Sequence, residues 1–377
     1  MKHLMGNYFD SIMEWVESAA YPLSYLSDDF SDVEAWQQKG REEVSKLLRY
    51  SPPSLPFDTQ VHKTYEKDGL EYQHISYAQS IGPRAEGILM RPVNSTGKLP
   101  AILALHDHGA FKYYGKEKIT ALDVEYPLLK EFKDDYYGGR SWATEIAKRG
   151  YVVFVPDMLL WGSRKMNVED VIENYVEDVV KHPTDTPEHI NAYNIFAGQH
   201  ETHIAKTLFK IGITWPGVMV YEDMRALDFL LSQPDVDPAN VGCGGLSCGG
   251  LRTVYLAAMD PRIKCSVVAG FMSTTSELAG YKIGTHTWML YTPGLTNLLD
   301  FPDLYSLHGA KPTMVLFDAD DDLFTTKGQE DSNERLTQIY TKMGVPHLYR
   351  GHFFPGPHKF DVPMQEVAFA FYDEFMK

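Results

Sequence analysis

A glycine–serine pattern in the second half of the chain, Gly245-Leu246-Ser247-Cys248-Gly249, restricts the fold more than any other feature. Residues 240–244 before it predict a short buried strand, and residues 250–259 after it predict a helix. A serine on so tight a strand-to-helix turn is pushed clear of the sheet, and the flanking glycines remove side chains that would clash there. The segment therefore predicts a sheet with a serine exposed at its edge.

Strands and helices alternate through most of the chain. Compact apolar runs predict strands at 70–79, 87–93, 99–106, 151–156, 265–269, 312–317 and 347–350. Apolar stripes at helical spacing predict helices at 31–48 (entered through a capping box at Ser31), 141–149, 219–231 and 330–343, with a closing helix capped by Asp361. This order is typical of an α/β fold whose mostly parallel central sheet is covered by helices on both faces.

The chain divides unevenly around that sheet. We expect residues 1–65 to form an N-terminal helical extension that packs on the core, and residues 66–377 to form the main α/β domain. Two stretches interrupt the alternation, at 163–215 and 271–310. Insertions between sheet elements build lids and pocket walls in such folds, so we assign the first to a cap or lid and the second to a pocket wall.

Composition excludes several classes of partner. The 377 residues carry a formal charge of −16, which disfavours nucleic acid and anionic membranes. No run of about 18 apolar residues is present, and acidic residues interrupt the first 21, unlike a signal peptide. Three cysteines at predicted buried positions (Cys243, Cys248 and Cys265) indicate free thiols in a reducing compartment. We therefore expect a cytoplasmic protein with a small-molecule substrate; a homo-oligomer is compatible with the sequence.

An exposed serine becomes a nucleophile only when a base takes its proton and a carboxylate orients that base. The strand at 312–317 runs directly into an acidic turn, and the strand at 347–350 is followed by two histidines. Residue types and order alone leave the choice open among the following candidates: Asp318, Asp320, Asp321, Asp322, His352 and His358.

The chain resembles the bacterial dienelactone-hydrolase and acetyl-xylan-esterase-like branch of the α/β-hydrolase superfamily over about residues 85–375. The matching pieces are Leu105–Gly109, Pro156-Asp157 with Trp161-Gly162-Ser163, Gly245–Gly249, Phe301–Leu304, Asp321–Phe324 and Gly356–Phe360. The resemblance implies Asp321 as the orienting acid and His358 as the base. Asp318 stands where that branch commonly has glycine, which keeps Asp320 and Asp322 as alternatives.

Two backbone amides are needed to hold the negative oxygen of the tetrahedral intermediate, each contributing about 3–4 kcal/mol. The amide of Cys248, next to the serine, is one candidate. The other belongs to the loop after residues 99–106, where we choose His108 over Gly109. The branch commonly has His-Gly here, whereas this chain has His106-Asp107.

Aromatic residues on loops at the carboxyl edge of the sheet are candidates for substrate binding. They are Trp161, Tyr114, Phe271, Trp288 and Tyr291. We expect no metal and no cofactor. His106 and His108 lack further ligands nearby, His200-Glu201-Thr202-His203 is one residue short of a zinc-protease motif and is interpreted as a surface helix, and the acidic turn lacks the glycine and glutamate of a calcium loop.

The sequence thus predicts a serine-dependent carboxylester hydrolase that acts on small, acetyl-like esters through Ser247, His358 and Asp321. A lactone or amide hydrolase with the same three residues is one alternative. A catalytically silent hydrolase fold that only binds ligand is another, and the retained serine, acid and histidine count against it.

Overall fold

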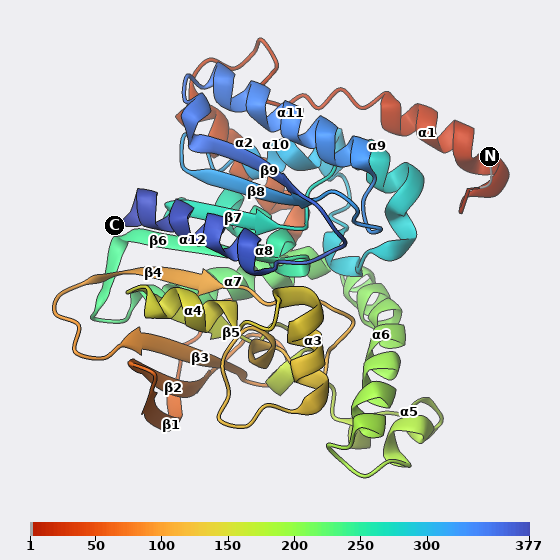
Figure 1. Cartoon of the computed structure of the whole chain (residues 1–377). Helices are drawn as coiled ribbons and strands as arrows, with labels where there is room; N and C mark the ends of the chain where they lie inside the picture. The colour runs from red at the N-terminus through yellow and green to blue at the C-terminus, as the bar shows by residue number, and fades with distance from the viewer. Residues whose placement is uncertain (1–2) are drawn as a thin grey trace.

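The computed structural model describes residues 3–377 and contains one mixed sheet (Figure 1). Its nine strands lie in the order β1-β2-β3-β5-β4-β6-β7-β8-β9. Their bounds are β1 Gln60–Lys67, β2 Leu70–Tyr77, β3 Ala85–Pro92, β4 Leu99–Ala104, β5 Val152–Pro156, β6 Val236–Leu246, β7 Cys265–Ala269, β8 Thr313–Asp318 and β9 Tyr349–Phe354. The strands from β5 to β9 are parallel, whereas β1, β2 and β3 extend the sheet as an antiparallel edge.

Helices cover both faces of the sheet except at its exposed edge strand, and a buried apolar core lies on each covered face. One face packs on α2 Val33–Leu48, α7 Trp215–Leu231, α8 Cys248–Met259, α10 Phe301–Ser306 and α11 Thr326–Lys342. The other packs on α3 Pro127–Tyr137, α4 Trp142–Lys148 and α12 Val362–Met376. The expected α/β class is confirmed.

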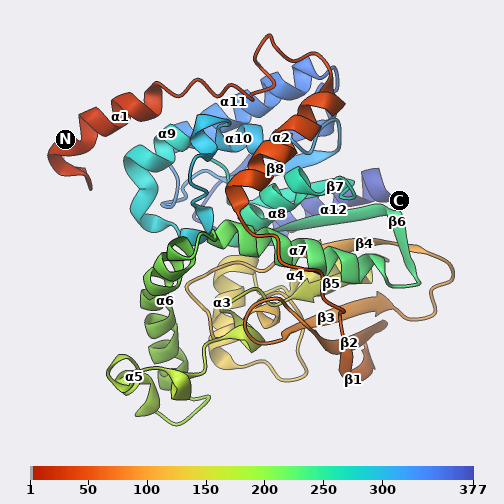
Figure 2. The ribbon, with the colours of Figure 1, turned by 180° about the vertical axis from the view of Figure 1, so that it is seen from behind.

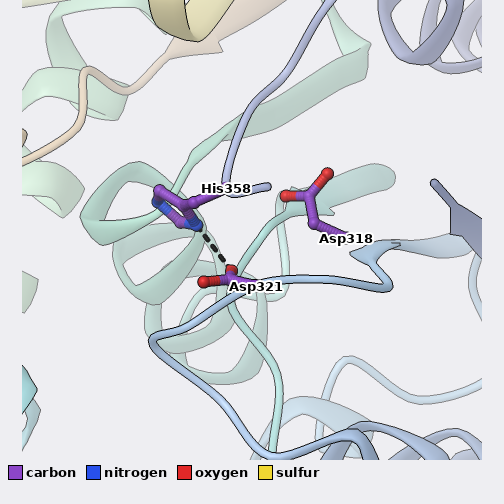
Figure 3. Close-up of side chains that lie close together, drawn as sticks. All are labelled: Asp318, Asp321 and His358. Atoms are coloured by element: carbon purple, nitrogen blue, oxygen red, sulfur yellow. Dashed lines mark hydrogen bonds and ion pairs between the residues drawn. The ribbon is translucent and has the colours of Figure 1, made fainter. Parts of the chain in front are cut away.

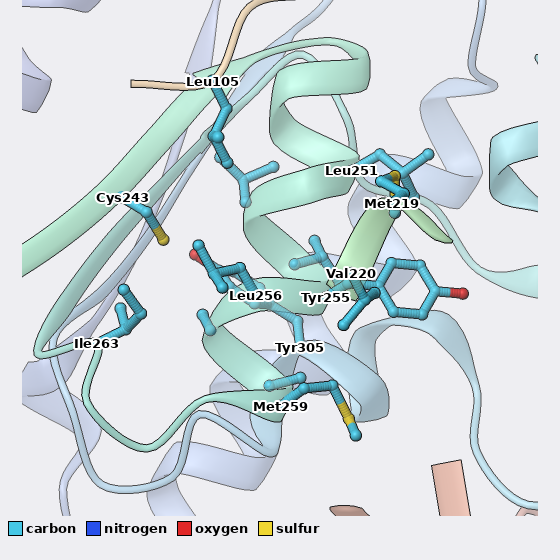
Figure 4. Close-up of a cluster of buried hydrophobic side chains, with 14 of the residues drawn as sticks. Leu105, Met219, Val220, Cys243, Leu251, Tyr255, Leu256, Met259, Ile263 and Tyr305 are labelled. Carbon is cyan, nitrogen blue, oxygen red and sulfur yellow. The ribbon is translucent and has the colours of Figure 1, made fainter. Parts of the chain in front are cut away.

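Helix α8, which follows the glycine–serine turn, lies within the first core cluster, the apolar core on the face of the sheet covered by α2, α7, α8, α10 and α11. Every residue of α8 is buried. Figure 4 shows Leu251, Tyr255 and Leu256 of this helix packed between Cys243 of β6 and Met219 of α7. Because fully burying one such side chain is worth about 1.5–3 kcal/mol, this packing fixes the helix and with it the turn that precedes it.

Most predicted elements are found within a few residues of their expected bounds, and β7 matches residues 265–269. Three differences stand out. Strand β1, with an almost fully exposed outer surface, and helix α3 were not predicted. The capping residue of α2 is Asp32, whose carboxylate accepts hydrogen bonds from the amides of Glu34 and Ala35, and not Ser31.

The two interrupting stretches lie beside the sheet (Figures 1 and 2). Residues 163–215 contain α5 Glu173–Val180 and the long helix α6 Pro187–Lys210, which projects from the body of the molecule. Residues 271–310 consist of short helical turns, including α9 Thr275–Glu277, before α10 begins. Within residues 3–377, no helix has both the length and the apolar character needed to cross a bilayer.

Candidate active site

Ser247 occupies a strained turn between β6 and α8. Its φ and ψ angles are 57° and −121°, a conformation that costs a non-glycine residue free energy and occurs mainly where surrounding packing enforces it. The glycines on either side explain why the turn closes. A Cβ atom at Gly245 or at Gly249 would lie 2.1 Å from the same carbonyl oxygen, that of Leu105. The predicted turn is therefore present with its serine at the N-terminus of α8.

His358 and Asp321 are brought together from two loops at the carboxyl edge of the sheet (Figure 3). Nδ1 of His358 lies 2.6 Å from Oδ2 of Asp321, and Oδ1 of Asp321 accepts a hydrogen bond of 2.8 Å from the amide of Leu323. Burial of His358 opposes its protonation, but the hydrogen bond and charge of Asp321 prevail and raise the pKa of the imidazole. With Nδ1 engaged, Nε2 is the nitrogen left for chemistry.

Asp318 is a second buried carboxyl beside this pair (Figure 3). Ligand atoms of Asp318, Asp321 and His358 all lie within 4.8 Å of one another. Asp318 accepts a hydrogen bond from the amide of Lys359 through Oδ2, whereas its Oδ1 is buried without a partner. Desolvation raises the pKa of Asp318 to about 7, so near neutral pH this carboxyl carries only part of its negative charge, while Asp321 faces the histidine.

The other candidates from the acidic turn and the histidine loop lie outside this cluster. Asp320 and Asp322 are exposed, and Asp320 accepts a hydrogen bond from the amide of Gly356. His352 is exposed on β9.

Ser247 and His358 open on one cavity of about 260 Å³. It lies where β4, β6, β7, β8 and β9 end, and the second inserted stretch forms part of its wall. Its lining consists of His108, Gly109, Ala110, Tyr136, Ser247, Cys248, Phe271, Thr285, His286, Thr287, Leu323 and His358. The cavity is smaller than the 300–1,000 Å³ that is usual for drug-sized ligands.

The loop after β4, residues 108–110, forms the cavity wall opposite His358. Gly109 and Ala110 both have positive φ angles, 57° and 50°. The carbonyl oxygen of His108 accepts hydrogen bonds from Nε1 of Trp161 (3.1 Å) and Nζ of Lys118 (3.2 Å). Cys248 lines the same cavity as this loop, and because it is the first residue of α8 its amide has no intrahelical acceptor.

A charged cluster that the sequence analysis missed lies behind this loop. Glu201 of α6 is only 6% exposed, and its Oε1 lies 2.6 Å from both Nε2 of His108 and Nζ of Lys112. Lys112 and Glu201 form an ion pair whose angles are unsuitable for a hydrogen bond. Nζ of Lys112 also lies 3.3 Å from the centre of the Trp161 ring. Despite its burial, these partners lower the pKa of Glu201 to about 2. Interpreting residues 200–203 as a surface helix was therefore wrong for Glu201.

Of the aromatic residues expected in the pocket, Phe271 lines the cavity and the others do not. Trp161 is fully buried beneath His108, with the two rings edge to face at 4.9 Å. Tyr114 packs against Phe111 and Tyr126 in the second core cluster, and Trp288 packs against Tyr291 and Phe209. Position on a loop at the correct edge did not distinguish cavity lining from packing. The cavity residues Tyr136, Thr285, His286 and Thr287 were missed.

Among residues 3–377, only Asp318, Asp321 and His358 form a group of three whose ligand atoms approach closely enough to suggest a metal site. The 2.6 Å separation of His358 Nδ1 and Asp321 Oδ2 fits a hydrogen bond. Two ligands at about 2.0–2.2 Å from one tetrahedral ion would stand farther apart. This geometry favours a histidine–carboxylate pair.

Comparison with known proteins shows which family of proteins the chain is related to. The sequence model described as the dienelactone hydrolase family matches residues 137–360, more than half of the chain. The protein YtaP of Bacillus subtilis (strain 168), which is named as a candidate hydrolase, is 23% identical over 320 residues, covering 83% of this chain and 93% of its own.

Solved structures show the same fold at low sequence identity. A protein of Bacteroides fragilis NCTC 9343 described as a candidate acetyl xylan esterase superposes with a TM-score of 0.70 at 16% identity, over 93% of this chain and 83% of its own. A glucuronoyl esterase from Solibacter usitatus superposes with a TM-score of 0.61 at 15% identity, over 92% and 94%. The α/β-hydrolase fold is thus shared, and the chain is a hydrolase that belongs to the dienelactone hydrolase family.

Proposed function

We propose that this protein is a serine carboxylester hydrolase for small acyl groups. The observation that carries the proposal is the cavity lined by both the strained Ser247 and His358, which is oriented by Asp321. In this mechanism Oγ of Ser247 attacks the ester carbonyl while Nε2 of His358 takes the hydroxyl proton. The amides of Cys248 and His108 stabilise the resulting oxyanion.

The intermediate then collapses with loss of the alkoxide, which takes the proton from His358. An acyl group remains on Ser247. Water enters, loses a proton to the same nitrogen and attacks the acyl carbonyl, which releases the acid and restores the serine. The cavity of about 260 Å³ favours acetyl over long acyl chains. The acetyl xylan esterase description of a structural relative is in keeping with this choice.

A lactone is the alternative substrate that the name of the family supports. Attack by the same serine would open the ring, and the leaving alkoxide would stay tethered to the acyl group. To distinguish the two substrate classes, the rates of hydrolysis of p-nitrophenyl acetate and of a γ- or δ-lactone are compared, with release of acid measured for both.

The decisive experiment is hydrolysis of p-nitrophenyl acetate by the wild type and by Ser247→Ala, each with and without EDTA. We expect EDTA-insensitive activity in the wild type and loss to background in the variant. A matched control is Ser273→Ala, which removes a buried hydroxyl that does not line the cavity. Labelling of Ser247 by a fluorophosphonate tests the nucleophile independently of substrate choice. Full activity in Ser247→Ala would exclude the serine mechanism.

A further inference from the structure

Glu201 connects two walls of the cavity that are distant in the sequence, those that contain His108 and Thr287. Its Oε1 lies against Nε2 of His108 from the loop after β4, and against Nζ of Lys112. Its Oε2 accepts a hydrogen bond of 2.9 Å from Oγ1 of Thr287, in the second inserted stretch. The carboxylate itself is carried by α6, in the first inserted stretch. One buried side chain therefore links both insertions to the sheet.

The bonds of the His108 ring show what this link does. Nδ1 of His108 accepts a hydrogen bond of 2.9 Å from the amide of Ala110, so the ring hydrogen is on Nε2 and is donated to Glu201. Burial, followed by the charge of Lys112, lowers the pKa of His108, which keeps the ring neutral. Both nitrogens are occupied, and the ring is a brace rather than a base.

The segment that this ring braces, residues 108–110, has unfavourable backbone angles. Ala110 has a φ of 50°, which a residue with a Cβ adopts only when neighbouring contacts hold it. The hydrogen bond from Ala110 to the His108 ring closes this turn, and Glu201 fixes the ring that closes it. Without the carboxylate, the imidazole loses its anchor and Lys112 becomes a buried cation without a counter-ion.

From these contacts we infer that Glu201 is a positioning residue, which sets the loop at residues 108–110 in the geometry that binds the oxyanion. The inference rests on the proposed function, since it assigns to Glu201 the placement of the His108 amide. Stabilisation by preorganised donors depends on their being fixed before the reaction, and displacement by about 1 Å can cost 100-fold in rate.

The test compares Glu201→Ala and the nearly isosteric Glu201→Gln with the wild type. We expect kcat to fall about 10- to 100-fold in Glu201→Ala with KM within about threefold, because the loss concerns the transition state. Glu201→Gln keeps an oxygen for the Nε2–H of His108 and is expected to recover part of the loss. Affinity for a trifluoromethyl ketone, which forms an oxyanion on the serine, should fall in parallel with kcat/KM.

A buried ion pair away from the cavity supplies the control. Glu222 of α7 is 4% exposed and pairs with Arg164 at 2.5 Å. Glu222→Gln therefore removes a comparable buried charge without touching the loop. We expect it to lower the melting temperature while the kcat of the folded enzyme stays near that of the wild type. Equal kcat losses in Glu222→Gln and Glu201→Gln would show that Glu201 acts only through stability.

Hydrogen exchange of the peptide that contains residues 106–114 tests the brace without any chemistry. Faster exchange in this peptide in Glu201→Ala, with the peptides of α8 and β6 unchanged, is the expected result. Unchanged exchange and unchanged ketone affinity would overturn the inference even if Ser247 is labelled by fluorophosphonate. Conversely, absence of labelling in the wild type would overturn the proposed function, while the exchange data would still decide whether Glu201 holds the loop.

Discussion

Two histidine–carboxylate pairs border the same cavity with the same separation of 2.6 Å, His358 with Asp321 and His108 with Glu201. Their pKa shifts are opposite. The pKa of His358 is raised, whereas that of His108 is lowered, because burial and the cation of Lys112 outweigh the charge of Glu201. In His358 one ring nitrogen remains for the substrate, while in His108 both are engaged within the protein. We therefore propose that the same pair of residue types serves as a base in one place and as a brace in the other.

Removing each imidazole should separate the two roles most strongly. His358→Ala is expected to lower kcat by about 10⁴–10⁶-fold, the range seen when the base of such a triad is lost. His108→Ala should lose about 10- to 100-fold, because the backbone amide remains while its fixing contact is gone. Kinetics with p-nitrophenyl acetate measure both, with the exposed His352→Ala as the control. Inactivation by His352→Ala while His358→Ala stays active would overturn the choice of base.

Replacing each of the two buried aspartates next to His358 should also give unequal losses of kcat. Asp321→Asn is expected to lower kcat by about 10⁴-fold, because the imidazole loses the partner that sets its tautomer. Asp318→Asn should stay within about tenfold of the wild type, since the imidazole is hydrogen-bonded to Asp321 and Asp318 carries only part of its charge at this pH. Steady-state kinetics of the two variants at pH 7 provide the comparison. Equal losses would show that the orienting carboxylate has been assigned to the wrong residue.

The pH profile should report the ionisation of His358 and not that of His108. The reactive form of this base is neutral, and its pKa is raised above the ordinary value of about 6.5, so kcat/KM should fall as the pH drops through a value above 6.5. His108, with a lowered pKa, stays neutral through this range. In Asp318→Asn the descending limb should move to lower pH, because the charge of Asp318 contributes to the raised pKa. An unchanged limb would argue against that contribution.

The smallest effect concerns stability. The raised pKa of Asp318 means that the folded state holds a proton which the unfolded state has released between about pH 4 and pH 7. Stability conferred by this site therefore decreases as the pH rises through that window. Asp318→Asn should melt at a higher temperature than the wild type at pH 8, and the difference should shrink toward pH 4. Thermal melts at both pH values test this, and a constant difference would contradict it.

The parts of the site that follow from the sheet could be predicted from the sequence. Ser247, Asp321 and His358 each follow a strand in chain order, and parallel strands bring their carboxyl ends to one edge. The choice of Asp321 among four aspartates came from a family resemblance, because exposure and the bond to His358 decide it, and the sequence shows neither. In the structure Asp320 and Asp322 face solvent.

The contribution of the insertions could not be predicted in the same way. Glu201 lies 93 positions from His108, on a helix whose placement depends on tertiary packing. One local signal was available. Glu201 falls on the same helical stripe as the buried residues Ala197, Ala205 and Leu208, and a glutamate on an apolar stripe needs a buried partner. Lys112, within the aromatic run Phe111–Tyr114, is the matching cation, and only the fold reveals that the two meet.

Within the 24-residue helix α6, Glu201 is the residue whose carboxylate bonds to the cavity-lining side chains of His108 and Thr287, and part of the helix projects from the body of the molecule. During divergence, the exposed residues of this insertion can change or lengthen while that carboxylate and the buried Arg164 are kept. Substrate range and turnover would then be inherited from different parts of the chain. Chimeras that exchange the exposed residues of this insertion and retain Ser163, Arg164 and Glu201 are accordingly a route to new ester specificities with the proposed triad unchanged.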